Sequence, residues 1–167
     1  MNKTELLDTL RAFAAKRPRL DFADYGNAQT YRQESRAITR DLHNARELIR
    51  AVELSSITAE QIIQASTSAF SGRLTITETE SGYKLDYCVG QYFPTEYRKA
   101  VCAVLSAALW NYYRDQCMPE PEYIQHGSAV DLPMRTEILF NGLSAGDYLR
   151  RTFRRNFSRS VVNTWFN

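Results

Sequence analysis

The feature that most constrains the fold is the segment 94–116, which is apolar on almost every side of a helix. Such a helix has to be buried, because no side of it can face water. Pro94 suits its first turn. The longest apolar run, residues 100–110, is interrupted by Ser106 and is far shorter than the ~20 residues of a membrane span. The segment therefore predicts the central helix of a globular core, with apolar positions that include Val101, Val104, Leu105, Ala107, Ala108, Leu109 and Trp110.

Two amphipathic helices are predicted before this segment. Residues 4–16 repeat leucine and phenylalanine at steps of three and four. Residues 28–54 form one long apolar face, whose opposite side is charged. On that charged side Arg50 stands three residues from both Glu47 and Glu53, which predicts ion pairs on the helix surface. We expect the two helices to pack antiparallel.

A short helix and a β-hairpin are expected before the central helix. Thr58 and Gln61 have the spacing of a capping box, which opens a helix to about residue 66. Over 72–88 the pattern changes to strict alternation around Ser81-Gly82, which is typical of a hairpin. Because a hairpin alone is marginally stable in water, we expect it to pack on the helices.

The chain after the central helix is less regular. Two prolines interrupt it, and residues 118–133 are expected to form a loop. Residues 133–140 fit either a short helix or a strand, Asn141-Gly142 turn the chain, and a last helix is predicted over 145–165. If residues 133–140 were helical, the segment would form a helix-turn-helix.

Length and composition complete the fold prediction. A chain of 167 residues, 44% apolar and 24% charged, suits one soluble globular domain over 1–167. We expect a mainly helical α+β fold, with four to five helices around the central helix 94–116 and one hairpin over 72–88. No secretory signal is seen, so a cytoplasmic location in a bacterial cell is expected. The odd set of cysteines, at spacings that match no zinc pattern, fits free and mostly buried thiols: Cys88, Cys102 and Cys117.

Basic charge is concentrated at the C-terminal end, although the whole chain carries only +2. Residues 147–167 have a net charge of +4, whereas residues 119–146 have −3. On a helix the arginines share a broad sector opposite Leu149 and Phe153. Such a helix can dock by its apolar side and present arginine to carboxylates or phosphates, or it can fold back and neutralise the acidic stretch. The five arginines are Arg150, Arg151, Arg154, Arg155 and Arg159.

Aromatic side chains cluster where the hairpin enters the central helix. Most of them are expected to be buried or half-buried. An exposed subset that includes Tyr92, together with Arg98, would resemble a protein–protein hot spot. Stacking of single-stranded bases is the other use of aromatic rings beside basic groups. The cluster comprises Tyr83, Tyr87, Tyr92, Phe93 and Tyr97.

Few side chains offer catalytic or metal chemistry. The chain has two histidines, of which His43 is expected to be solvated and His126 to be held by acidic residues of its loop. Asp86 and Glu96 are a candidate carboxylate pair, although their spacing does not require it. The sequence contains no Gly-rich phosphate loop and no Gly-x-Ser-x-Gly. We therefore expect no enzyme, no cofactor and no metal site.

Three stretches of the sequence stand out: residues 85–102, Leu20-Asp21-Phe22 with Tyr25-Gly26, and Gly146-Asp147-Tyr148. Together they resemble uncharacterised small accessory proteins of phages and conjugative elements. The resemblance spans most of the chain and implies mobile-element cargo, a class rich in inhibitors of restriction and CRISPR systems. Those inhibitors bind a nuclease complex without catalysis, and the resemblance assigns no role to any residue. Many of them are strongly acidic DNA mimics, whereas this chain is slightly basic, so mimicry by overall charge is not expected.

Together these features predict a non-enzymatic binding protein of a mobile genetic element. It is expected to inhibit a host CRISPR or restriction complex by protein–protein contact, through the basic helix and the aromatic patch near Tyr92. The partner is then a protein or nucleoprotein defence complex, with no membrane involved. The alternative is a DNA-binding protein or transcriptional regulator that uses the arginine-rich helix, whose binding would weaken steeply with salt.

Overall fold

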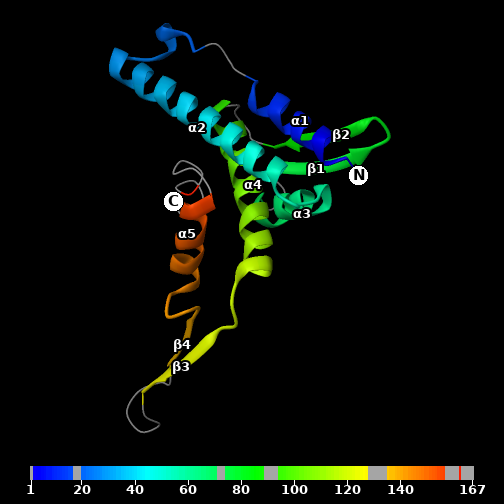
Figure 1. Ribbon diagram of the computed structural model, residues 1–167. Coiled ribbons are helices and arrows are strands. Elements are labelled where there is room, and N and C mark those ends of the chain that lie inside the picture. Colours follow the sequence, from blue (N-terminus) through cyan, green and yellow to red (C-terminus); the bar gives the residue numbers. More distant parts are fainter. Residues whose placement is uncertain are drawn as a thin grey trace. The chain divides into compact units, whose positions relative to one another are not determined.

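The computed structural model describes residues 2–16, 20–70, 74–88, 94–127, 135–156 and 162 (Figure 1). Their contacts divide the chain into two compact units, Met1–Leu109 and Trp110–Asn167, and one helix runs through the division. The single-domain organisation stays a prediction. In the part of the chain that is described, no helix is long and apolar enough to span a membrane.

Helices α1 (Lys3–Ala14) and α2 (Ala28–Leu54) form the antiparallel pair that was predicted. Each begins at an asparagine, Asn2 or Asn27, whose side chain accepts a hydrogen bond from the first turn. The Lys3 ammonium donates to the backbone carbonyls of Val52 and Ser55 at 3.1 and 2.7 Å. These bonds tie the start of α1 to the end of α2. A short 3-10 helix, Phe22–Asp24, lies in the connection between them.

Helix α3 (Ala59–Phe70) begins at the predicted capping box. The backbone N–H of Thr58 donates to Gln61 Oε1 at 2.9 Å, and the N–H of Gln61 donates to Thr58 Oγ1 at 3.3 Å. The helix ends at Phe70, beyond the expected end at about residue 66.

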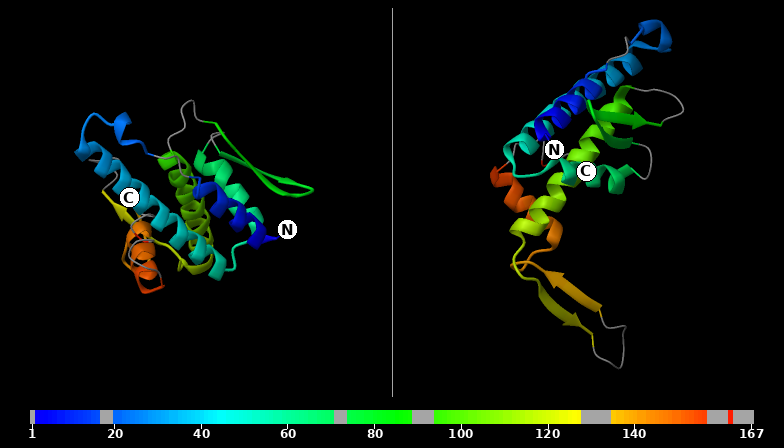
Figure 2. Two further views of the ribbon diagram at one scale, coloured as in Figure 1. Left: turned by 90° about the horizontal axis from the view of Figure 1, so that it is seen from above. Right: turned by 90° about the vertical axis from the view of Figure 1, so that its right-hand side faces the viewer.

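The predicted hairpin consists of β1 (Leu74–Thr79) and β2 (Gly82–Tyr87). The strands pair antiparallel, with Leu74 opposite Tyr87 and Thr79 opposite Gly82. The two-residue loop is Glu80-Ser81, one residue earlier than expected, because Gly82 already pairs as the first residue of β2 with a φ of 134°. Helix α1 contacts β2 and α3 contacts β1, so the hairpin packs on helices as predicted (Figures 1 and 2).

Helix α4 (Pro94–Cys117) is the buried helix predicted from its composition. Ala100, Val101, Val104, Leu105 and Leu109 are all 0% exposed, so the part of α4 in the N-terminal unit is core on several sides. The mainly helical α+β fold around this helix is therefore confirmed.

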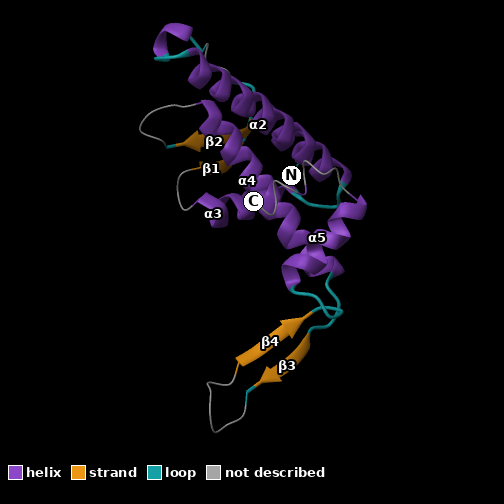
Figure 3. Ribbon diagram, turned by 90° about the vertical axis from the view of Figure 1, so that its left-hand side faces the viewer, coloured by secondary structure: helices purple, strands orange, loops and turns teal. Residues whose placement is uncertain are grey.

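A second hairpin, absent from the prediction, follows α4. It consists of β3 (Glu122–His126) and β4 (Arg135–Leu139), with Tyr123 opposite Ile138 (Figure 3). The expected loop over 118–133 is therefore wrong for its strand residues, and residues 133–140 contain a strand. A helix-turn-helix is also wrong, because the segment that would supply its first helix is β4.

Helix α5 (Ala145–Asn156) is the arginine-rich helix. Its predicted continuation to residue 165 lies outside the described residues, except at position 162. In the part of the C-terminal unit that is described, the core contains Leu149, Phe153 and Val162, against which three partly buried residues pack: Trp110, Tyr113 and Met118.

Candidate partner-binding surface

Helix α5 is amphipathic and is fixed by its apolar side. Leu149 and Phe153 are both 0% exposed, and the Phe153 ring meets the Tyr113 ring edge to face at 5.0 Å between centroids. At the N-terminus the backbone N–H of Asp147 donates to Ser144 Oγ at 3.2 Å, which caps the first turn. Docking and capping together determine which side of α5 faces outward.

The outward side carries three exposed arginines, Arg151, Arg154 and Arg155, which we call the arginine face. Arg150 is more buried, and its Nη1 lies 3.5 Å from Asp147 Oδ1. Within the described residues no acidic side chain forms an ion pair with the arginine face. The expectation that this helix neutralises the acidic stretch is therefore not met by Glu120, Glu122 or Glu137, the described acids of residues 119–146.

A small pocket of about 230 Å³ lies on one flank of the arginine face. Arg151 and Arg155 stand one helical turn apart there, so two arginine side chains line one concave site. Arg154 does not line the pocket. The other lining residues are Asn141, Leu143, Tyr148 and Thr152.

A tight turn builds the wall of this pocket opposite α5. Asn141 and Gly142 have φ angles of 51° and 73°, the left-handed values of a two-residue hairpin turn. The flanking Phe140 and Leu143 exchange two backbone hydrogen bonds of 2.7 and 3.1 Å. The predicted Asn-Gly turn is thus confirmed, and it places Asn141 and Leu143 beside Arg151 and Arg155.

The remaining predicted contact residues are not brought to this surface. Arg98 is 0% exposed in the N-terminal unit, because α4 turns this position inward with its apolar neighbours. The expected exposed contact at Arg98 is therefore wrong. Tyr92 and Arg159 lie outside the described residues.

The described part of the aromatic cluster is packed between elements. The Phe13 ring meets the Tyr97 ring at 4.7 Å and the Tyr87 ring at 6.0 Å, both edge to face. Tyr87 and Tyr97 are 5.2 Å apart, and both are half-buried. These rings join α1, β2 and α4, so their role is packing.

The residues considered for catalysis do not form a common site. Asp86 pairs with Lys84 at 3.0 Å and Glu96 with Lys99 at 3.0 Å, so each carboxylate has its own lysine. His126 Nε2 lies 2.6 Å from Glu137 Oε2 across the second hairpin, a partner outside its expected loop.

The two cysteines with described side chains differ in their surroundings. Cys88 is exposed, whereas burial, together with the nearby Asp41, raises the pKa of the Cys102 thiol to about 12. The side chain of Cys117 lies outside the described part. Over the described residues no three metal-ligating side chains gather into a possible metal site.

Sequence reasoning missed two surface features. The second hairpin exposes Tyr123, Ile124 and Ile138, at 65%, 39% and 48%. The second missed feature is a groove between α1 and α2. The sequence predicted that Arg50 pairs with Glu53 on the same helix, whereas Glu53 pairs with Arg11 of the other helix at 3.1 Å. The signal available for the groove was the recurrence of arginine at one-turn spacing beside the apolar face of α2.

Comparisons of the chain with known protein families, with curated proteins and with solved structures find no match. Functional inference therefore rests on the geometry and charge of the surface.

Proposed function

We propose that this chain is a non-enzymatic binding protein whose arginine face engages an acidic surface of a partner protein. The observation that carries the proposal is an exposed cluster of three arginines, without an acidic partner among the described residues, on a helix anchored by Phe153. A guanidinium group stays protonated throughout the physiological range, so it binds anions without exchanging protons. Such side chains suit recognition rather than acid–base chemistry.

The pocket beside the face supports recognition of one anionic group at a defined place. Two guanidinium groups one turn apart can both donate to one carboxylate, which gives charge-assisted hydrogen bonds and a fixed orientation. We propose that an aspartate or glutamate of the partner enters between Arg151 and Arg155. Arg154, outside the pocket, adds attraction at longer range.

The class of partner is proposed from the resemblance to accessory proteins of mobile elements. It is a protein or nucleoprotein complex of host defence, of the CRISPR or restriction type, which this chain would inhibit by occupying a functional surface. A second candidate is direct DNA binding, since phosphates also suit the two arginine side chains that line the pocket. The two candidates differ in their sensitivity to salt and to nuclease.

The test uses three forms of the full chain: the wild type, Arg151→Glu/Arg155→Glu, and the control Arg32→Glu/Arg36→Glu. The control changes the net charge equally, at two exposed α2 positions that are also one turn apart. Each form is used as bait in a bacterial lysate with and without nuclease treatment, and bound proteins are quantified by mass spectrometry. Binding of a labelled DNA duplex is measured separately at 50 and 300 mM salt.

The proposal expects a stoichiometric protein partner that survives nuclease, is retained by the control and is lost with the α5 variant. The loss is expected to be at least about tenfold in affinity, because each charge-assisted hydrogen bond contributes roughly 1.5–3 kcal/mol. Equal retention by both variants would refute the role of the pocket. Loss of all bound protein on nuclease treatment, with salt-sensitive duplex binding, would favour the DNA-binding candidate instead.

A further inference from the structure

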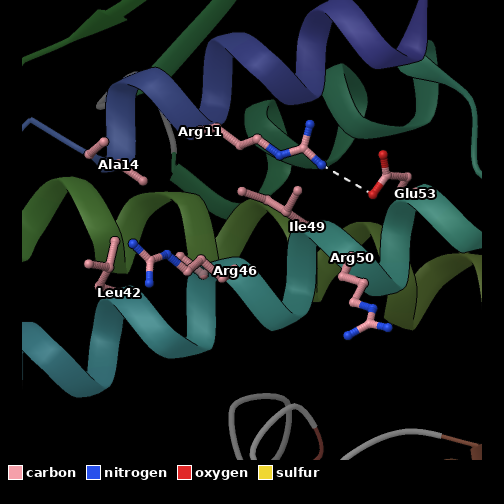
Figure 4. A pocket seen from close by; sticks show the side chains of 9 residues that line it. Arg11, Ala14, Leu42, Arg46, Ile49, Arg50 and Glu53 are labelled. Atoms are coloured by element: carbon pink, nitrogen blue, oxygen red, sulfur yellow. Dashed lines mark hydrogen bonds and ion pairs between the residues drawn. The ribbon is translucent and has the colours of Figure 1, made fainter.

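A separate concave site lies within the N-terminal unit, between α1 and α2 (Figure 4). It is an open groove of about 510 Å³, within the roughly 300–1,000 Å³ of small-molecule sites. Its floor is apolar and consists of Ala14 from α1 and Leu42, Ala45 and Ile49 from α2. The alanines leave space between the two helices, because their side chains end at Cβ.

The rim of the groove is charged, and one of its arginines is already neutralised. Arg11 donates hydrogen bonds to Asp8 and, at 3.1 Å, to Glu53, the acid on the groove's edge. The hydrogen bond to Asp8, followed by that to Glu53, raises the pKa of Arg11, while burial acts in the opposite direction. Glu53 therefore has its counter-charge on α1 and does not engage Arg50.

Arg46 and Arg50 form the remaining charged edge. Both are exposed, and neither has an ion pair or hydrogen bond to any residue that the structure describes. They are four residues apart, which places their backbones about 6 Å apart along the helix axis. In Figure 4 the Arg46 side chain extends along α2 toward Leu42, whereas Arg50 points away from α1. The groove thus combines an apolar floor with two arginines available to an anion.

We propose that this groove binds a soluble organic anion with an apolar body, a carboxylate carrying a short hydrocarbon chain being the simplest example. The apolar body covers Ala14, Ala45 and Ile49, and the positive charges of Arg46 and Arg50 at the edge of the groove attract the carboxylate. Charge complementarity argues for this class, since the lining residues carry three arginines against one acid. The site is independent of the α5 surface, because no lining residue is shared.

The experiment titrates the ¹⁵N-labelled full chain with decanoate below its micelle concentration and follows the amide spectrum. Two probes separate the contributions of the ligand: acetate, which lacks the apolar body, and decyltrimethylammonium, which has the body and the opposite charge. Two variants address the groove. Arg46→Glu/Arg50→Glu removes the anion contacts, and Ala15→Phe fills the groove from an exposed lining position. Arg32→Glu/Arg36→Glu again serves as the control of equal charge on the same helix.

The proposal expects saturable decanoate shifts at Ala45, Ile49 and their neighbours. Affinity should fall at least about tenfold in both groove variants and stay within about twofold in the control. Equal binding of acetate or of decyltrimethylammonium would overturn the proposal, because it needs both charge and apolar contact. Unchanged affinity in the folded Arg46→Glu/Arg50→Glu variant, or an equal loss in the control, would overturn it as well. The amide spectrum itself shows that each variant is folded.

Discussion

The outward orientation of the arginine face depends on Phe153, so replacement of that side chain by alanine is the most informative structural test. Phe153 is 0% exposed and sits in a core whose other buried members, among the residues that the structure describes, are Leu149 and Val162. Phe-to-Ala changes in cores cost about 3–5 kcal/mol, through lost transfer free energy and the cavity that remains. The ring contact with Tyr113 at 5.0 Å belongs to this loss, and such pairs contribute roughly 0.5–1.5 kcal/mol beyond burial.

We therefore expect Phe153→Ala to lower the free energy of unfolding of the C-terminal unit by about 4 kcal/mol. The assay is urea unfolding in a Trp165→Phe background, so that the fluorescence reports Trp110, which packs against this core. Far-UV circular dichroism follows the whole chain in parallel. If the two units unfold separately, the fluorescence transition should shift, and the circular dichroism should change only in the part that the C-terminal unit contributes.

Two further variants calibrate the result. Arg154→Ala lies on the exposed side of the same helix and should change stability by less than about 0.5 kcal/mol. Phe153→Leu leaves a smaller cavity and should fall between wild type and Phe153→Ala. A loss below about 1 kcal/mol for Phe153→Ala would refute the docking of α5 by this side, and with it the argument that the arginines face outward.

Two predictions concern the N-terminal unit. In Cys88→Ser/Cys117→Ser, the Cys102 thiol should resist an aromatic disulfide reagent at pH 8 until urea is added, because burial raises its pKa to about 12 from an ordinary 9.0. Since the folded state keeps the thiol proton to higher pH than the unfolded state, the free energy of unfolding should fall as pH rises from about 9 towards 12. Rapid labelling of Cys102 at pH 8 without urea would contradict the burial of this thiol. Gly82→Ala should lower the free energy of unfolding by about 1–3 kcal/mol in urea titrations, because Gly82 has a φ of 134°, which strains any residue with a Cβ; the carboxylate end of Glu5, 2.7 Å from the added Cβ, can rotate away. Gly26→Ala, where the added Cβ meets no atom within 4 Å, is the matched control, and equal effects would contradict the argument.

The sequence predicts an element well where one of its sides is buried. Helix α2 has the predicted bounds of 28–54 because its apolar face continues to Val52, and α3 begins at Thr58 because a local capping box needs no tertiary information. Strands β1 and β2 are recognisable because Leu74 and Ile76 alternate with exposed residues. For α2 and the first hairpin, burial of one side requires apolar residues at regular spacing, and this spacing is visible in the sequence.

The second hairpin was missed for the same physical reason. All five residues of β3 are exposed, so neither side of the strand needs apolar residues and no alternation appears. The candidate sites are also hard to predict in full. Arg151 and Arg155 are recognisable from their spacing, but the wall formed by Asn141 and Leu143 depends on how the chain turns before α5. In the groove, Glu53 pairs with Arg11 of another helix and not with Arg50 of its own helix. That pairing depends on tertiary structure, which the sequence pattern does not show.

The arginines of α5 contribute little to the stability of the helix. Like charges one turn apart, as at Arg151 and Arg155, destabilise a helix by about 0.2–0.5 kcal/mol per pair. Arginine in the last turn, at Arg154 and Arg155, gains about 0.3–1 kcal/mol from the helix dipole. In Arg151→Glu/Arg155→Glu the two substituted side chains still repel each other, and the acid at position 155 loses the dipole gain and meets the negative end of the helix. The free energy of unfolding should therefore fall by up to about 2 kcal/mol, and binding is compared only where urea unfolding shows the variant to be folded. A loss of partner binding in that variant would then report the chemistry of the surface and not the folding of the protein.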